Sequence, residues 1–186
     1  GKLVPQDPED ETASKLLERI EEEKKRLYKE GKIKKPKKLP EIALDDLTLS
    51  LPRGWTATTL SNLGVFCGGK TPSKSKSEFW NGAVPWVTPK DMKFSEIADT
   101  EDHVTRLATV SGGLELLPPG TVLFVVRSGI LRRMFPAAIT RTHCTINQDL
   151  KALKLFKPEM ARYIQIMSWG YERFILKNLT KTGTTV

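Results

Sequence analysis

From residue 51 onward the chain consists of short apolar runs separated by turn residues, and this spacing restricts the fold more than any other feature. Each run has the length of a β-strand and is too short for a core helix. Pro118, Pro119 and Gly120 form a strong turn signal before the longest run. The predicted strands cover residues 55–60, 65–67, 84–87, 121–126, 137–140 and 150–155.

Residues 158–178 instead show the three-to-four-residue periodicity of a helix, which Pro158 starts and Gly170 weakens locally. We expect its apolar face to lie in the core, and large aromatic side chains elsewhere to lie there too. The helix face consists of Met160, Ile164, Met167, Tyr171, Phe174 and Ile175, and the other aromatic side chains expected in the core are Trp55, Trp80 and Trp86.

A second helix is predicted over residues 13–30, after helix-capping residues at 10–12 and before Gly31. Its apolar seam is narrow and interrupted by Lys24, so it needs a surface to lie against: its own domain, a partner helix or a longer coiled coil. The predicted fold is therefore α+β, with short, twisted, mainly antiparallel strands and a main C-terminal helix, preceded by a long exposed N-terminal helix.

Charge is distributed unevenly along the 186 residues, whose net charge is +8. Residues 1–50 carry 12 basic and 12 acidic side chains, whereas residues 51–186 carry 18 and 10. Five lysines lie in residues 32–38, which we interpret as an extended Lys/Pro linker that either contacts nucleic-acid backbone or is simply solvated. We divide the chain into a helical segment (1–31), a linker (32–50) and a basic domain (51–186), for which a polyanion partner and general solubility are both open interpretations.

Several classes of function lack sequence support. No apolar run is long enough to span a membrane, and two distant cysteines without a signal peptide favour a reducing, cytoplasmic setting. Cys67, His103, His143 and Cys144 do not have the spacing of a zinc site, and no paired carboxylates or nucleophile–base pair stands out. We therefore expect no metal, no cofactor and no catalytic activity.

Residues 64–71 match the phosphate-loop string G-x-x-x-x-G-K-T, but their context does not fit nucleotide binding. No buried strand precedes the string, and Pro72 opposes a helix starting at Lys70 and Thr71. A basic loop remains, in which Lys70, Thr71, Lys74 and Lys76 can contact DNA phosphates.

A second basic cluster follows the longest apolar run, so that a rigid strand presents it. Arginine forms bidentate contacts with phosphate or guanine, and glycine lets a backbone approach closely. The cluster comprises Arg127, Ser128, Arg132 and Arg133 around Gly129. Downstream, Asn147 and Gln148 can either read base edges or form internal hydrogen bonds.

Six short motifs follow one another along residues 51–149, and three more lie upstream. The six are LPRGW (51–55), GKTPS (69–73), FWNG (79–82), PWVTPKDM (85–92), LPPGTVL (117–123) and TINQD (145–149); the three are KLVPQDP (2–8), LLERI (16–20) and EGKIKK (30–35). In this order they resemble a target recognition domain, preceded by the end of the conserved helical spacer, of type I restriction-modification specificity subunits. RSGILR (127–132) resembles a subgroup of those domains.

The resemblance implies sequence-specific binding of double-stranded DNA without catalysis, each recognition domain reading half of a split site. It implies modification (methyltransferase) subunits held by the spacer helices and, indirectly, a restriction subunit. Self-association through the N-terminal helix is also open, because the chain is expected to be one half of a longer subunit or a half-length subunit that pairs with itself. Lys181, Thr182 and Thr184 are a third group of candidate DNA contacts. The alternative is a basic protein-interaction module without sequence-specific readout.

Overall fold

The computed structural model describes residues 7, 9–35 and 51–179. The chain divides into two compact units, Gly1–Val65 and Phe66–Val186, which are described separately below. Most of the predicted linker, residues 36–50, lies outside the described residues, so the boundaries after residues 31 and 50 stay predictions.

The first unit contains helix α1 (Ala13–Lys29) and the short helix α2 (Leu60–Leu63). The prediction of a helix from residue 13 is confirmed, although the Thr12 side chain forms no capping bond. Instead, the Ala13 amide donates to the Gly54 carbonyl at 2.8 Å. Gly31 has φ +67°, the left-handed conformation that commonly ends a helix.

The apolar seam of α1 is buried most deeply at Ile20, which is 1% exposed. Lys24, which interrupts the seam, is also buried, and its ammonium group donates to Glu21 at 3.1 Å. Residues 55–59 form no strand, contrary to prediction, and Trp55 is 46% exposed rather than in the core. The alternating threonines serve side-chain hydrogen bonds instead: Thr56 with Ser14 at 3.0 Å, and Thr58 with Asn62 at 3.3 Å.

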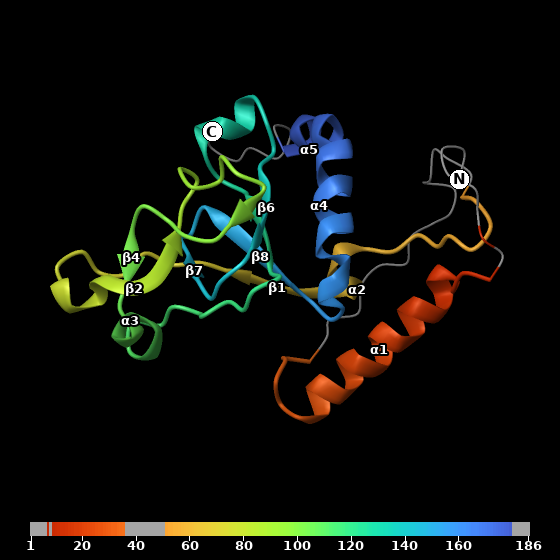
Figure 1. Ribbon diagram of the computed structural model, residues 1–186, viewed down its shortest axis with the longest axis horizontal. Helices are drawn as coiled ribbons and strands as arrows, with labels where there is room; N and C mark the ends of the chain where they lie inside the picture. Colours follow the sequence, from red (N-terminus) through yellow and green to blue (C-terminus); the bar gives the residue numbers. More distant parts are fainter. Residues whose placement is uncertain (1–6, 8, 36–50, 180–186) are drawn as a thin grey trace. The chain divides into compact units, whose positions relative to one another are not determined.

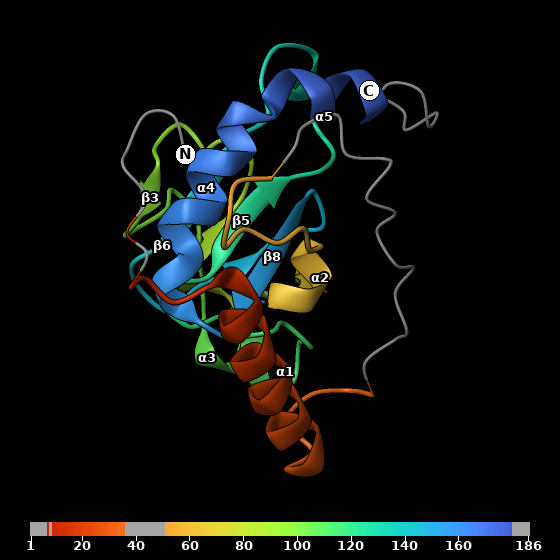
Figure 2. The same cartoon turned by 90° about the vertical axis from the view of Figure 1, so that its right-hand side faces the viewer.

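The second unit is built on a five-stranded sheet in the order β1-β8-β5-β6-β3. Its strands are β1 (Gly64–Gly68), β8 (Leu150–Leu155), β5 (Val122–Val125), β6 (Ala137–Thr140) and β3 (Glu96–Ile97). The central strand β5 runs antiparallel to β8 and β6, and β3 is parallel to β6. Figure 1 labels β6 and β8 of this sheet, and the turned view of Figure 2 shows β5 between them. The predicted α+β class with mainly antiparallel strands is confirmed.

A three-stranded sheet, β4-β2-β7, completes the unit. Strand β2 (Trp80–Val87) pairs antiparallel with β4 (His103–Val104) and parallel with β7 (Thr145–Ile146). The 3₁₀ turn η2 (Ser77–Phe79) and helix α3 (Arg106–Val110) pack against this sheet. They enclose a cluster of Phe79, Val84, Trp86, Val104, Ala108 and Leu114, with Trp80 half-buried beside it. The core prediction for Trp86 is therefore confirmed.

The C-terminal helix is split, contrary to the prediction of a single helix over residues 158–178. A 3₁₀ turn η4 (Pro158–Met160) leads into α4 (Ala161–Gly170), and α5 (Glu172–Leu179) follows after Tyr171. Helix α4 packs on β5 and β6 (Figure 2). Ile164 is buried as expected, but Tyr171 and Phe174 are 50% and 66% exposed, because the interruption at Tyr171 breaks the helical face on which the core prediction relied.

Candidate nucleic-acid interface

Four loops of the second unit come together at one end of its strands. They are residues 69–76 after β1, 88–94 after β2, 126–133 after β5 and 147–149 after β7. The parallel strands β2 and β7 end side by side, and the Asn147 amide donates to the Val87 carbonyl at 3.0 Å. The Lys70 amide donates to Ile146, and the Val126 and Arg127 amides donate to Asp149. The two predicted basic loops and the Asn147–Gln148 pair are therefore linked through one turn.

Gly69 allows this convergence because no side chain fits at its position. A Cβ atom there would lie 2.1 Å from the Asn147 carbonyl oxygen and 2.2 Å from that of Ile146. The glycine of the phosphate-loop string thus allows two backbone segments to pack closely. No helix begins at Lys70 or Thr71, in agreement with the argument from Pro72.

Asp149 is the hydrogen-bonding centre of the turn, a role that the sequence did not reveal. Its carboxylate accepts from Arg127 Nε at 2.7 Å and from Asn147 Nδ2 at 2.9 Å. The Asp149 amide in turn donates to Asn147 Oδ1 at 3.0 Å. Both ends of the buried Asn147 amide are therefore bonded to Asp149, which is an internal role. The sequence contained one indication of this role, because an Asn side chain commonly hydrogen-bonds to the backbone two residues further on, which here is that of Asp149.

Gln148, between these two residues, points outward and is exposed. The Thr71 hydroxyl donates to Gln148 Oε1 at 2.6 Å, so the two predicted DNA contacts from different loops are neighbours. Arg127 is also outward, with a side chain 57% exposed against 24% for its partner Asp149.

The lysines of the first basic loop lie in different surroundings. Lys70 is exposed, and its carbonyl accepts from Trp86 Nε1 at 3.1 Å. The Lys76 ammonium lies 5.1 Å from the centre of the Phe79 ring, a cation–π contact. Lys74 lines an open hollow of about 620 Å³, together with Trp80, Trp86, Thr88, Pro89, Lys90, Asp102, Asn147 and Asp149.

Asp91 shapes the loop that borders this hollow. Its carboxylate accepts from the Thr88 amide at 2.8 Å, the Thr88 hydroxyl at 2.9 Å and the Glu101 amide at 3.1 Å. Such local bonds hold a turn in place. The motif PWVTPKDM thus forms one wall of the hollow, and sequence reasoning did not connect it with the basic loops.

The arginine cluster forms a 3₁₀ turn, η3 (Gly129–Arg132), and not an irregular loop. The Ser128 hydroxyl caps it by accepting from the Ile130 amide at 3.4 Å, and Leu131 is buried beneath it. Arg132 and Arg133 are exposed. Nothing in the described chain lies within 4 Å of a Cβ atom placed on Gly129. Lys181, Thr182 and Thr184 lie outside the described residues.

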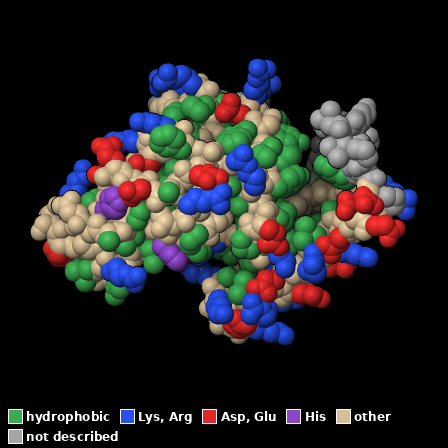
Figure 3. All heavy atoms as spheres, viewed as in Figure 1, with side chains coloured by type: hydrophobic (Ala, Val, Ile, Leu, Met, Phe, Trp, Pro, Cys, Tyr) green, Lys and Arg blue, Asp and Glu red, His purple; other side chains and the backbone are tan. Residues whose placement is uncertain are grey.

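Basic side chains do not form one continuous patch on the face of the molecule shown in Figure 3, where Lys and Arg are scattered among acidic and apolar side chains. Several are paired, including Arg141 with Glu96 and Lys154 with Glu115. Net charge alone therefore does not locate a site, and the four loops are defined by their contacts.

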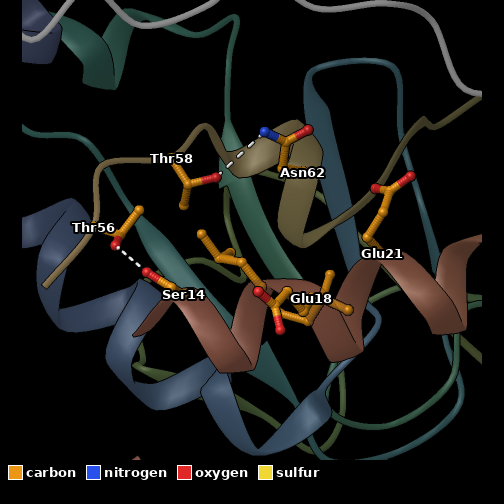
Figure 4. Close-up of a pocket in the computed structure, with 8 residues that line it drawn as sticks. Ser14, Glu18, Glu21, Thr56, Thr58 and Asn62 are labelled. Carbon is orange, nitrogen blue, oxygen red and sulfur yellow. Dashed lines mark hydrogen bonds between the residues drawn. The ribbon is translucent and has the colours of Figure 1, made fainter. Parts of the chain in front are cut away.

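The first unit has a hollow of its own, of about 390 Å³, between α1 and residues 56–62 (Figure 4). Leu17 and Ile20 of the apolar seam line it, with Glu18 and Glu21. Among residues 7, 9–35 and 51–179, no three His, Cys, Asp or Glu side chains are grouped to hold a metal ion. In the same ranges no helix is long and apolar enough to cross a bilayer.

Comparison with known proteins gives a consistent result. No protein-family model matches the sequence. The EcoR124I/EcoR124II specificity subunit of Escherichia coli is 39% identical over 129 residues, which are 69% of this chain and 32% of that subunit. The MjaIX specificity subunit of Methanocaldococcus jannaschii is 32% identical over 136 residues, covering 64% and 31% of the two chains. The EcoAI subunit of E. coli is 59% identical over 63 residues, 34% of this chain and 11% of that subunit.

A solved structure of an HsdS subunit from Thermoanaerobacter tengcongensis aligns with a TM-score of 0.49 and 18% identity, over 92% of this chain and 41% of that one. The chain spans about a third of the length of the first two sequence relatives. The family resemblance expected from the ordered motifs is confirmed. The chain belongs to the type I restriction enzyme specificity subunits.

Proposed function

We propose that residues 51–186 are a target recognition domain that binds double-stranded DNA and reads one half of a bipartite site without catalysing a reaction. The convergence of four loops at one end of the second unit supports this proposal. They bring Thr71, Arg127 and Gln148 from distant parts of the sequence to one turn, and Lys74 lines the hollow beside it. The Lys70 amide is bonded to the same turn, and its ammonium group donates to the Gly112 carbonyl at 3.5 Å. Such a set combines charge for phosphates with polar groups for base edges, which are the two components of specific recognition.

Residues 1–31 are, on this proposal, the end of a spacer helix and residues 32–50 a linker. The hollow beside α1 supports a helix that is completed by another chain, because Leu17 of the apolar seam lines it and is only half-buried. Modification subunits are the proposed partners there, with self-association as the second use of the seam and a restriction subunit joining indirectly. The proposed location is the cytoplasm, which is supported by two free cysteines of the kind that a reducing compartment preserves.

Salt dependence tests the proposal. A mixed-sequence duplex should bind the chain at about 50 mM salt and lose affinity at about 200 mM, because each neutralised phosphate contributes about −0.9 to the slope of log K against log salt. Lys70→Ala and Lys74→Ala should each lower that slope by about one. Fluorescence anisotropy of a labelled duplex measures both effects.

Lys157→Ala is the matched control, because it removes the same charge at a different place. Lys157 follows the C-terminal end of β8, whereas the four loops meet at the other end of that strand. Its slope should equal that of the unaltered chain. Absence of binding at low salt, or binding that salt does not weaken, contradicts DNA recognition. Equal binding of all duplexes by the assembled complex contradicts sequence choice.

A further inference from the structure

Hydrogen bonds with Asp149 and Thr71 leave donor groups at the outward ends of the Arg127 and Gln148 side chains. We propose that Asp149 and Thr71 orient these two side chains so that the turn selects guanine in the major groove. This inference rests on the proposed function, and it makes Asp149 and Thr71 positioning residues for base choice.

Asp149 determines which part of the Arg127 guanidinium remains available. Its carboxylate occupies Nε at 2.7 Å, and the backbone amide of Arg127 is also bonded to Asp149. The two Nη groups form the outer end of a side chain that is 57% exposed. A guanidinium whose Nε is held in this way presents its two terminal nitrogens end-on as parallel donors.

Thr71 determines which end of the Gln148 amide faces outward. Because its hydroxyl donates to Oε1 at 2.6 Å, the Nε2 group, which only donates, is directed away from that contact. Asn147, the other amide of the turn, is bonded at both ends to Asp149 and offers nothing outward. The exposed side-chain ends at Arg127 and Gln148 are therefore donors.

Donors of this kind distinguish the bases by their major-groove edges. Guanine alone presents two acceptors, N7 and O6, side by side, and an end-on arginine pairs with both. Adenine and cytosine each present an amino donor, which would face another donor here. A phosphate also accepts hydrogen bonds from arginine, but it carries no sequence information. A contact with guanine therefore changes which sequences are bound, whereas a contact with phosphate changes only the affinity for all of them.

Selection from a randomised duplex library at about 50 mM salt tests the inference. The chain should enrich a position occupied by guanine. At that position 7-deazaguanine, which lacks N7 but keeps O6, should weaken binding by up to about tenfold, because it removes one of the two hydrogen bonds of the bidentate contact. Arg127→Lys should weaken the guanine preference while the salt dependence stays the same, because lysine keeps the charge but lacks the planar fork. Thr71→Val should admit adenine or cytosine at the base next to Gln148, because the amide is then free to turn.

Asp149→Asn tests the positioning role itself. It should remove the guanine preference without lowering affinity for arbitrary duplexes, since it deletes a negative charge. If that variant does not fold, the base preferences of the Arg127→Lys and Thr71→Val variants test the inference instead. Thr109→Val is the matched control for Thr71→Val, because the Thr109 hydroxyl donates to the Arg106 carbonyl within helix α3, outside the four loops. It should leave the selected sequences unchanged.

Two results overturn the inference. One is enrichment of adenine or cytosine at the position sensitive to Arg127. The other is an Arg127→Ala variant that binds all duplexes more weakly by the same factor, with a salt slope lower by about one, which identifies a phosphate contact. Failure of the chain to bind any duplex at low salt instead contradicts the proposed function, whereas either of these two results contradicts only the present inference.

Discussion

At the scale of single residues, two glycines in basic loops have opposite surroundings. A Cβ atom on Gly69 would lie 2.1 and 2.2 Å from the carbonyl oxygens of Asn147 and Ile146. A Cβ atom on Gly129 would meet nothing in the described chain within 4 Å. The sequence analysis interpreted Gly129 as a point where a backbone can approach closely, but of the two glycines it is Gly69 that the packing of the chain itself requires.

Gly69→Ala should therefore destabilise the protein by about 3 kcal/mol, because backbone segments must move apart to admit the methyl group. Gly129→Ala, the control, should change the free energy of unfolding by less than about 0.5 kcal/mol, as is usual for an open surface site. Urea unfolding measures both values. Similar unfolding midpoints for the two variants would show that the contact of Gly69 with the β7–β8 turn is not structural.

The two cysteines offer a residue-scale test of burial. Burial raises the pKa of the Cys144 thiol to about 12, and burial, with the nearby Glu115 carboxylate, raises the pKa of Cys67 to about 11. Since the thiolate is the reactive form, both should react slowly with a disulfide reagent at pH 8, and quickly once the chain is unfolded in urea. Fast reaction of both thiols in the folded protein would contradict this burial.

At the scale of elements, one buried side chain joins helix α4 to the large sheet. Gln165 is 0% exposed, and its Nε2 donates to the Ser95 carbonyl at 2.6 Å and to the Ala137 carbonyl at 3.0 Å. Its Oε1 accepts from Arg162 at 2.7 Å. The periodicity of the helix identified apolar positions, but it did not identify this amide, because a polar residue on a helix predicts the exposed face.

Gln165→Leu should lower the free energy of unfolding by about 1 to 3 kcal/mol, the cost of one unsatisfied buried group, because the Ala137 carbonyl loses the Gln165 donor. The Ser95 carbonyl keeps the Ile139 amide as a donor. Ile166→Gln on the exposed side of the same helix should cost less than about 0.5 kcal/mol. Thermal or urea unfolding followed by circular dichroism compares them. Equal effects would mean that α4 is held by apolar contacts alone.

A helix or strand could be predicted where its own residues carry the periodic pattern that defines it. Strands β6 and β8 have the bounds expected from sequence, and α1 differs by one residue, because each carries a complete run of one periodicity. Strands β3, β4 and β7 have two residues each and were not predicted. So short a strand is defined by its partner's backbone, which no local pattern records.

At the scale of the whole molecule, the net charge of +8 does not by itself locate a DNA-binding surface. The excess of +8 belongs to residues 51–186, but Arg127, Arg141 and Lys154 each have an acidic partner. What distinguishes the four loops is the concentration of exposed cations and an amide at a single turn. The chain also spans only about a third of its first two relatives, so the proposed function concerns a recognition unit and its partners.

The sequence by itself determined the α+β class, the main helices and strands, the basic character of residues 51–186 and the family, because periodicity, composition and motif order are properties of the chain read in order. Only the tertiary structure decided that the loops after β1, β2, β5 and β7 meet, that Asn147 is used internally, and that Asp149 and Thr71 orient Arg127 and Gln148. The physical reason is that strand order and register arise from burying apolar faces against distant segments, which brings together residues that no spacing in the sequence connects.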